Sequence, residues 1–156
     1  MKIYRKEHTQ HLHVSLDEAW SYFSNPVNLA DITPSWLRFR LISSLPQEIY
    51  PGLILTYQIT PISRIPFSWV TEITHVKEKE YFVDEQRFGP YAFWHHQHHF
   101  RQLDNSVEMT DIVHYAMPFG PIGQLFHPLL VKNKVEDIFE YRRKKIKKIF
   151  IPNGEN

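Results

Sequence analysis

Residues 81–117 read YFVDEQRFGPYAFWHHQHHFRQLDNSVEMTDIVHYAM, and their pattern is the strongest structural signal in the chain. Within it, apolar or aromatic side chains alternate with polar ones in three runs, and a period of two residues is typical of a half-buried β-strand. The runs are residues 81–88, 93–103 and 106–117. Gly89-Pro90 and Asp104-Asn105 separate them and are typical turn sequences. The stretch therefore predicts three consecutive antiparallel strands joined by short turns.

The alternation also divides these strands into two faces, and we expect the more aromatic face to point into the protein. His95 and His99 fall on the opposite face, which we expect to contact water. The inward set is Phe82, Asp84, Gln86, Phe88, Trp94, His96, His98, Phe100, Met109, Asp111, Val113 and Tyr115.

The turns also predict which residues pair across the strands. If Asp104-Asn105 forms a two-residue hairpin turn, His98 lies opposite Asp111. If residues 89–93 form a five-residue loop, Asp84 lies opposite His98 as well. His98 would then stand between two carboxylates on the inner face. A register that differs by two residues would keep the faces and change the partners.

The composition limits the possible classes of protein. The chain has 156 residues, 42% of them hydrophobic and 22% charged, which predicts one globular domain over residues 1–156. A net charge of +1 argues against a dedicated nucleic-acid binder, because phosphate binding needs a strong positive field. The absence of cysteine excludes disulfides, thiolate catalysis and cysteine-ligated metals. Aromatic residues make up 15%, and 10 histidines accompany only 5 glycines, which suggests an interior lined by large rings.

The rest of the chain predicts an α+β domain. After an extended segment over residues 2–14, Ser15 and Glu18 have the spacing of a capping box, and Asn25 can cap a second short helix. A long helical stretch, kinked or restarted at Pro128, is expected to run to about residue 150. Six strands are expected between them, over residues 37–43, 53–60, 67–76, 81–88, 93–103 and 106–117. A curved sheet wrapped around a long helix packs this set of elements.

Several short motifs occur along the chain in this order of elements. They include Ser15-x-x-Glu18-x-Trp20, Trp69-x-Thr71-x-Ile73, Phe82-x-Asp84-x-Gln86, Trp94-x-His96-x-His98-x-Phe100 and Asp111-x-Val113-x-Tyr115-x-x-Pro118. With them the chain resembles the START/SRPBCC superfamily, and in particular a bacterial branch that also occurs fused to epimerase-like domains labelled as cell-division inhibitors. The resemblance implies a helix-grip fold: a curved antiparallel sheet around a long C-terminal helix, with two short helices after the first strand. It also allows an epimerase-like partner domain.

The superfamily contains binders, transporters and enzymes, so the fold alone does not give the function. We expect binding of a hydrophobic or amphipathic small molecule in a cavity between the sheet and the C-terminal helix, without a cofactor or a metal. The alternatives are a cyclase or hydratase acting on a polyketide-like or aromatic substrate, and a regulatory protein-interaction module. The candidate ligand-binding residues are Trp69, Asp84, Gln86, Trp94, His96, His98, Asp111 and Tyr115. No catalytic residue is assigned.

The inward histidines allow more than one interpretation. They could belong to a structural polar network, orient a ligand, or act as general acids and bases. His96, His98 and Asp111 also have a spacing that a metal could use, since alternate residues of a strand share a face.

Two further features bear on localisation. The basic run 142–148 is expected to be the solvated face of the last helix, although anionic lipid is an alternative partner. We identify no signal peptide and no apolar stretch of membrane-spanning length, so we expect a cytoplasmic protein without stable membrane insertion.

Overall fold

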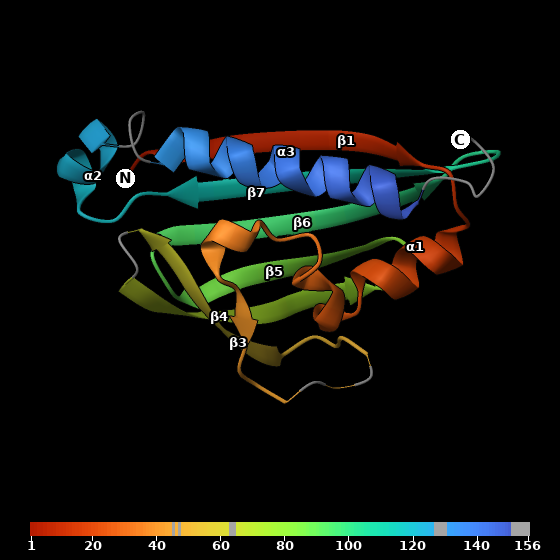
Figure 1. The fold of residues 1–156 in the computed structure, drawn as a ribbon, viewed down its shortest axis with the longest axis horizontal. Helices are drawn as coiled ribbons and strands as arrows, with labels where there is room; N and C mark the ends of the chain where they lie inside the picture. Colours follow the sequence, from red (N-terminus) through yellow and green to blue (C-terminus); the bar gives the residue numbers. More distant parts are fainter. Residues whose placement is uncertain (45, 47, 63–64, 127–130, 151–156) are drawn as a thin grey trace.

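The sheet has seven antiparallel strands in the order β1-β7-β6-β5-β4-β3-β2, so the first strand pairs with the last (Figure 1). A computed structural model describes residues 1–156 except 45, 47, 63–64, 127–130 and 151–156. The strands are β1 (Ile3–Leu12), β2 (Arg40–Leu41), β3 (Leu53–Ile62), β4 (Ile65–Lys77), β5 (Tyr81–Phe88), β6 (Phe93–Gln102) and β7 (Val107–Ala116).

Most of the helical segments cover one face of this sheet (Figure 1). The long helix α3 runs beside β1 and β7, while α1 and two short 3₁₀ helices cover the strands beyond them. Their bounds are α1 (Leu16–Phe23), η1 (Pro26–Leu29), η2 (Ser35–Leu37), α2 (Gly120–Phe126) and α3 (Lys132–Ile149). The predicted α+β helix-grip architecture is therefore confirmed.

Two expected elements differ in detail. The second short helix is the 3₁₀ helix η1, in which Asn25 accepts a hydrogen bond from the Val27 amide at 3.1 Å. The strand predicted over residues 37–43 is confined to β2, because Arg38 takes a left-handed conformation (φ 46°) that ends η2 and turns the chain. The predicted kink at Pro128 lies outside the described residues.

The register of β6 and β7 is the predicted one. His98 pairs with Asp111, and the Leu103 amide donates to the Ser106 carbonyl at 2.8 Å across the Asp104-Asn105 turn.

The predicted register of β5 and β6 is wrong by two residues. Asp84 pairs with His96, and regular pairing stops at Glu85 and His95, so the connection is wider than a five-residue loop. The Gln86 side chain stabilises this connection, donating to the Tyr91 carbonyl at 2.7 Å and accepting from the Tyr91 amide at 3.3 Å. Gly89 passes so close to the Gln86 amide group that a Cβ there would lie 2.4 Å from Oε1.

The assignment of the two faces holds for most of the inward set. Along β7 every second side chain from Val107 to Tyr115 is buried, and His96, His98 and Phe100 are buried on β6. Phe88 is an exception, with 64% of its surface exposed, because it follows the last regular pair of β5 and β6.

The helix α3 packs on the sheet through one apolar side. Val135, Phe139 and Ile146 are buried, and the Phe139 ring stacks on His8 of β1 at a centroid distance of 4.8 Å. Lys6 of β1 also forms an ion pair with Glu136 of α3. None of the helices in the described ranges is long and apolar enough to cross a membrane.

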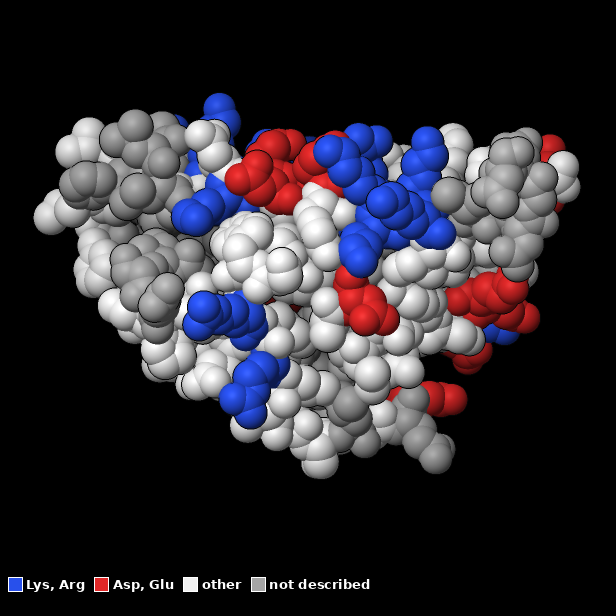
Figure 2. Space-filling view, viewed as in Figure 1, with Lys and Arg blue, Asp and Glu red and all other residues white. Residues whose placement is uncertain are grey.

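The basic run forms the exposed side of α3, as predicted, with the exception of Arg142 (Figure 2). Arg143, Lys144, Lys145, Lys147 and Lys148 are exposed, whereas Arg142 is half-buried.

The capping box at the start of α1 is present and gives a first prediction. The Ser15 hydroxyl accepts from the Glu18 amide at 3.2 Å, and the Glu18 carboxylate accepts from the Ser15 amide at 3.0 Å. We expect Ser15→Ala to lower the free energy of unfolding by about 1 kcal/mol, because the Glu18 amide loses its acceptor. Urea denaturation measures this, with exposed Ser21→Ala expected to stay within about 0.5 kcal/mol of wild type. Equal effects of the two changes would contradict a stabilising cap.

Candidate functional site

A cavity of about 330 Å³ lies between the sheet, α3 and the segment that contains η1 and η2. This volume is within the range of small-molecule sites, about 300–1,000 Å³. Its wall is mainly apolar and aromatic, with Phe23, Leu29, Leu55, Phe82 and Ile138 contributed by five different elements. The cavity therefore lies where the sequence predicts it, between the sheet and the C-terminal helix.

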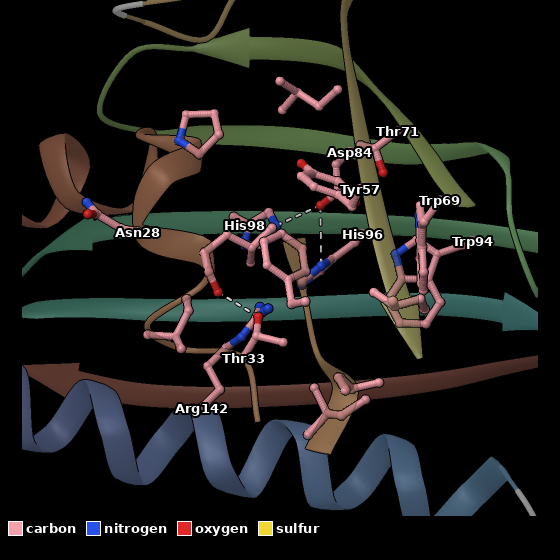
Figure 3. A pocket seen from close by; sticks show the side chains of 18 of the residues that line it. Asn28, Thr33, Tyr57, Trp69, Thr71, Asp84, Trp94, His96, His98 and Arg142 are labelled. Carbon is pink, nitrogen blue, oxygen red and sulfur yellow. Dashed lines mark hydrogen bonds and ion pairs between the residues drawn. The ribbon is translucent and has the colours of Figure 1, made fainter. Parts of the chain in front are cut away.

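Five of the eight candidate site residues line this cavity: Trp69 from β4, Asp84 from β5, and Trp94, His96 and His98 from β6. The two tryptophans form one end of the wall, with their rings edge to face at a centroid distance of 5.2 Å (Figure 3).

The other three candidates are not among the residues that line it. Gln86 is turned toward the β5–β6 connection, where it bonds to Tyr91. Tyr115 is buried in a separate aromatic cluster, stacked on Tyr4 at 5.5 Å. Asp111 lies behind the two histidines, in contact with both.

Asp84, Asp111, His96 and His98 form a compact cluster, here called the His–Asp quartet. Oδ2 of Asp84 lies 2.9 Å from His98 Nε2 and 3.4 Å from His96 Nδ1 (Figure 3). Oδ1 of Asp111 lies 2.9 Å from His96 Nε2 and 2.8 Å from His98 Nδ1. One oxygen of each aspartate thus contacts both rings, and each ring contacts both aspartates.

This arrangement is more symmetric than the predicted one, in which only His98 stood between two carboxylates. Asp111 faces His98 directly and Asp84 faces His96 directly. The other two contacts are diagonal, and diagonal neighbours on one face of a sheet are within reach of such side chains. The observed register therefore gives His98 and Asp84 different direct partners from the predicted ones, but His98 still contacts both carboxylates.

The quartet is shielded from water. His96 and His98 are 4% and 7% exposed, and the Phe82 ring stacks on His98 at a centroid distance of 4.2 Å. The Phe139 ring contacts His96 from α3, at 5.9 Å. Charges in such a site interact strongly, since little solvent screens them.

In the quartet, the contacts between opposite charges shift the pKa values in the direction opposite to that caused by burial. Burial alone would lower the pKa of His96, but the carboxylates of Asp84 and Asp111 outweigh it and raise this pKa. Burial would raise the pKa of both aspartates, yet the two imidazoles hold each pKa well below its usual value. The contacts with the imidazoles thus favour the ionised form of both carboxylates.

Several polar side chains of the cavity wall, Tyr22 and Arg142 among them, were not among the predicted site residues. Tyr22 of α1 and Arg142 of α3 both line the cavity, and the Tyr22 hydroxyl and Arg142 Nε are buried with no hydrogen-bond partner within the described part of the chain. The signal for Arg142 was its spacing, since Lys134, Ile138 and Arg142 recur every four residues and so share one side of a helix. Tyr22 carried no comparable signal.

The quartet gives a second prediction, on stability. Replacing Asp111 with Leu should cost about 1–3 kcal/mol of unfolding free energy, because the buried His96 Nε2 loses its hydrogen-bond partner and His98 loses a carboxylate contact. His99 lies on the opposite face of β6, where its Nε2 contacts Gln97, and His99→Ala should stay within about 0.5 kcal/mol of wild type. Chemical denaturation in the presence of a chelator compares the two, and an unchanged Asp111→Leu protein would show that the quartet does not brace the sheet.

Comparisons with known proteins agree at the level of the fold. Scans of protein-family models and of curated proteins found no match. A solved structure from Chromobacterium violaceum superposes with a TM-score of 0.72 at 10% identity, covering 96% of this chain and 98% of that one.

Two plant proteins are similarly close. Major latex-like protein 151 from Panax ginseng has a TM-score of 0.68 at 11% identity, covering 96% of this chain and 99% of its own. Norcoclaurine synthase from Thalictrum flavum, solved in complex with dopamine and hydroxybenzaldehyde, has a TM-score of 0.66 at 14% identity, covering 99% and 90%. At these identities the likeness concerns architecture alone, and it agrees with the helix-grip fold that the sequence resemblance implied.

Proposed function

We propose that this protein binds an amphipathic small molecule whose apolar body fills the cavity and whose acidic end meets Arg142. The cavity supports the first part, because a mostly apolar wall with a few polar groups is typical of a small-molecule site. Norcoclaurine synthase, which shares the fold, was solved with two aromatic small molecules.

The observation that carries the second part is the pair of unpartnered donors. Buried donors in folded proteins nearly always have an acceptor, so Arg142 Nε and the Tyr22 hydroxyl, unpaired among the described residues, call for one. The Arg142 charge also acts on Tyr22: burial and the Asp31 carboxylate raise the pKa of this tyrosine, and Arg142 opposes them. Both residues line the same cavity, and we place the acidic end of the ligand between them.

The surroundings of Arg142 reinforce this polarity. The cation lies 5.8 Å from the centroid of the Phe139 ring and forms no ion pair with a carboxylate in the described ranges, unlike Arg143, which binds Glu140 at 2.8 Å. Lys134 lies on the same side of α3, nearer the start of the helix, and also lines the cavity. Its Nζ lies 4.7 Å from the centroid of the Trp36 ring. The two cations in this wall, Arg142 and Lys134, would attract an anionic group of a ligand.

An enzyme of the cyclase or hydratase type is the second candidate, favoured by the two cavity-facing imidazoles of the quartet. A histidine whose orientation is fixed by carboxylates can transfer protons to a bound substrate. Native mass spectrometry of the purified protein separates the two functions: a retained, unchanged molecule supports binding, and release of a modified one supports catalysis.

The third prediction tests the acidic end with two matched fluorescent probes. Anilinonaphthalene sulfonate is anionic, and phenylnaphthylamine has nearly the same apolar body without the charge. Arg142→Gln should weaken binding of the sulfonate about tenfold or more, since a charge-assisted hydrogen bond contributes about 1.5–3 kcal/mol. The affinity for the neutral probe should stay nearly unchanged.

Arg143→Gln is the matched control, because Arg143 is the next residue and points to solvent. It should change neither affinity. Equal weakening of both probes by Arg142→Gln would show a packing role and not recognition of charge. Failure of the two probes to compete would show that they do not share the cavity, and would contradict the proposed function.

A further inference from the structure

We propose that Asp84, His96 and His98 form a binding site for a divalent transition metal at the wall of the cavity. In this site Asp111 holds the two imidazole rings from behind. The proposal rests on the geometry of the quartet and is independent of the acidic ligand group. It replaces the expectation that the protein binds no metal. It also assigns the carboxylate ligand to Asp84, whereas the metal spacing noted in the sequence involved Asp111.

The first argument is that three potential ligand atoms converge. His98 Nε2 and His96 Nδ1 lie 2.9 Å and 3.4 Å from the same oxygen of Asp84, and ligand atoms from the three residues all lie within 4.8 Å of one another. Nitrogen and oxygen ligands lie about 2.0–2.2 Å from Zn²⁺, so neighbouring ligands of a tetrahedral site are about 3.3–3.6 Å apart. Binding of an ion would therefore require the three side chains to rotate until these distances reach that range.

The second argument is the position of Asp111. Metal-bound histidines almost always donate their other ring N–H to a carboxylate or carbonyl, which fixes the ring and its tautomer. Here one oxygen of Asp111 meets the other nitrogen of both rings, at 2.9 Å from His96 Nε2 and 2.8 Å from His98 Nδ1.

The remaining nitrogen of each ring then points toward Asp84. His98 Nδ1 is buried, and its contact with Asp111 is not aligned as a hydrogen bond. A metal on His98 Nε2 would place the proton of the neutral ring on Nδ1, facing that oxygen.

The third observation concerns the partners of the carboxylates. Within the described ranges the ion-pair partners of Asp84 and Asp111 are the two histidines alone. No lysine or arginine of these ranges therefore competes with a bound cation for Asp84.

The fourth argument is access. Asp84, His96 and His98 line the cavity, whereas Asp111 is not among its lining residues, so a bound ion would keep open coordination positions toward the cavity. Two histidines and one carboxylate with open positions are a donor set for borderline metals such as Zn²⁺, Co²⁺ or Fe²⁺. A water or a ligand atom in the cavity could complete the coordination.

The fourth prediction uses the full chain without a histidine tag, after treatment with a chelator. Titration with Co²⁺, followed by visible absorption, and with Zn²⁺, followed by calorimetry, should show one tightly bound ion per chain. The absorption of Co²⁺ reports a site of low coordination number directly, which weak binding to surface histidines does not reproduce.

Four variants locate the site. Asp84→Asn and His98→Gln keep the side-chain size, and each should abolish the tight Co²⁺ signal. Asp111→Asn should weaken binding about 10–100-fold without removing the signal, as expected for a carboxylate behind the ligands. His99→Ala, on the opposite face of β6, should leave affinity and stoichiometry unchanged.

Thermal melts of the chelated variants show that each protein is folded before it is tested. Absence of a tight site in the wild-type chain would overturn the proposal, and so would tight binding that survives both His98→Gln and Asp84→Asn. Loss of the signal in His99→Ala would place the metal on the outer face and would overturn it as well.

Discussion

Two carboxylates buried inside a β-sheet impose the constraint on which the rest of this structure depends. Asp84 and Asp111 lie on the concave face, where an ionised group without a partner costs several kcal/mol. His96 and His98 stand between them and contact both carboxylates at four short distances. A shift of one residue in β6 would turn both imidazoles outward and leave the carboxylates unpaired, so charge as well as hydrophobicity fixes the phase of this strand.

The faces and the register of β6 and β7 could be predicted because both follow from local rules. Alternation has a period of two, and a two-residue turn at Asp104-Asn105 leaves a single possible pairing. The β5–β6 register could not be predicted in this way. It depends on the hydrogen bonds between the Gln86 side chain and the Tyr91 backbone. It also depends on the close approach of Gln86 to Gly89, where a Cβ would not fit, and these contacts arise only after the loop has folded.

The cavity wall was harder to predict than the sheet, because its polar groups come from distant parts of the chain. Trp69, Trp94 and the two histidines were found through strand alternation, but Tyr22 and Arg142 come from helices at opposite ends of the sequence. Arg142 begins a run of basic residues that resembles a uniformly solvated surface. Only the phase of α3, set by Phe139 and Ile146 in the core, separates Arg142 from the exposed cations that follow it.

The two polar ends of the cavity differ in what holds them, and this bears on what each can do. The His–Asp quartet is fixed by paired strands and by mutual contacts, so its atoms are already arranged for a small, charged partner such as a proton or a metal ion. Arg142 extends from α3 on a long side chain whose guanidinium has no fixed acceptor among the described residues. The planar guanidinium of an arginine matches the geometry of a carboxylate or phosphate, which suits the acidic ligand group that we propose. The sheet thus positions the His–Asp quartet in the cavity wall, and helix α3 positions a cation in the same wall.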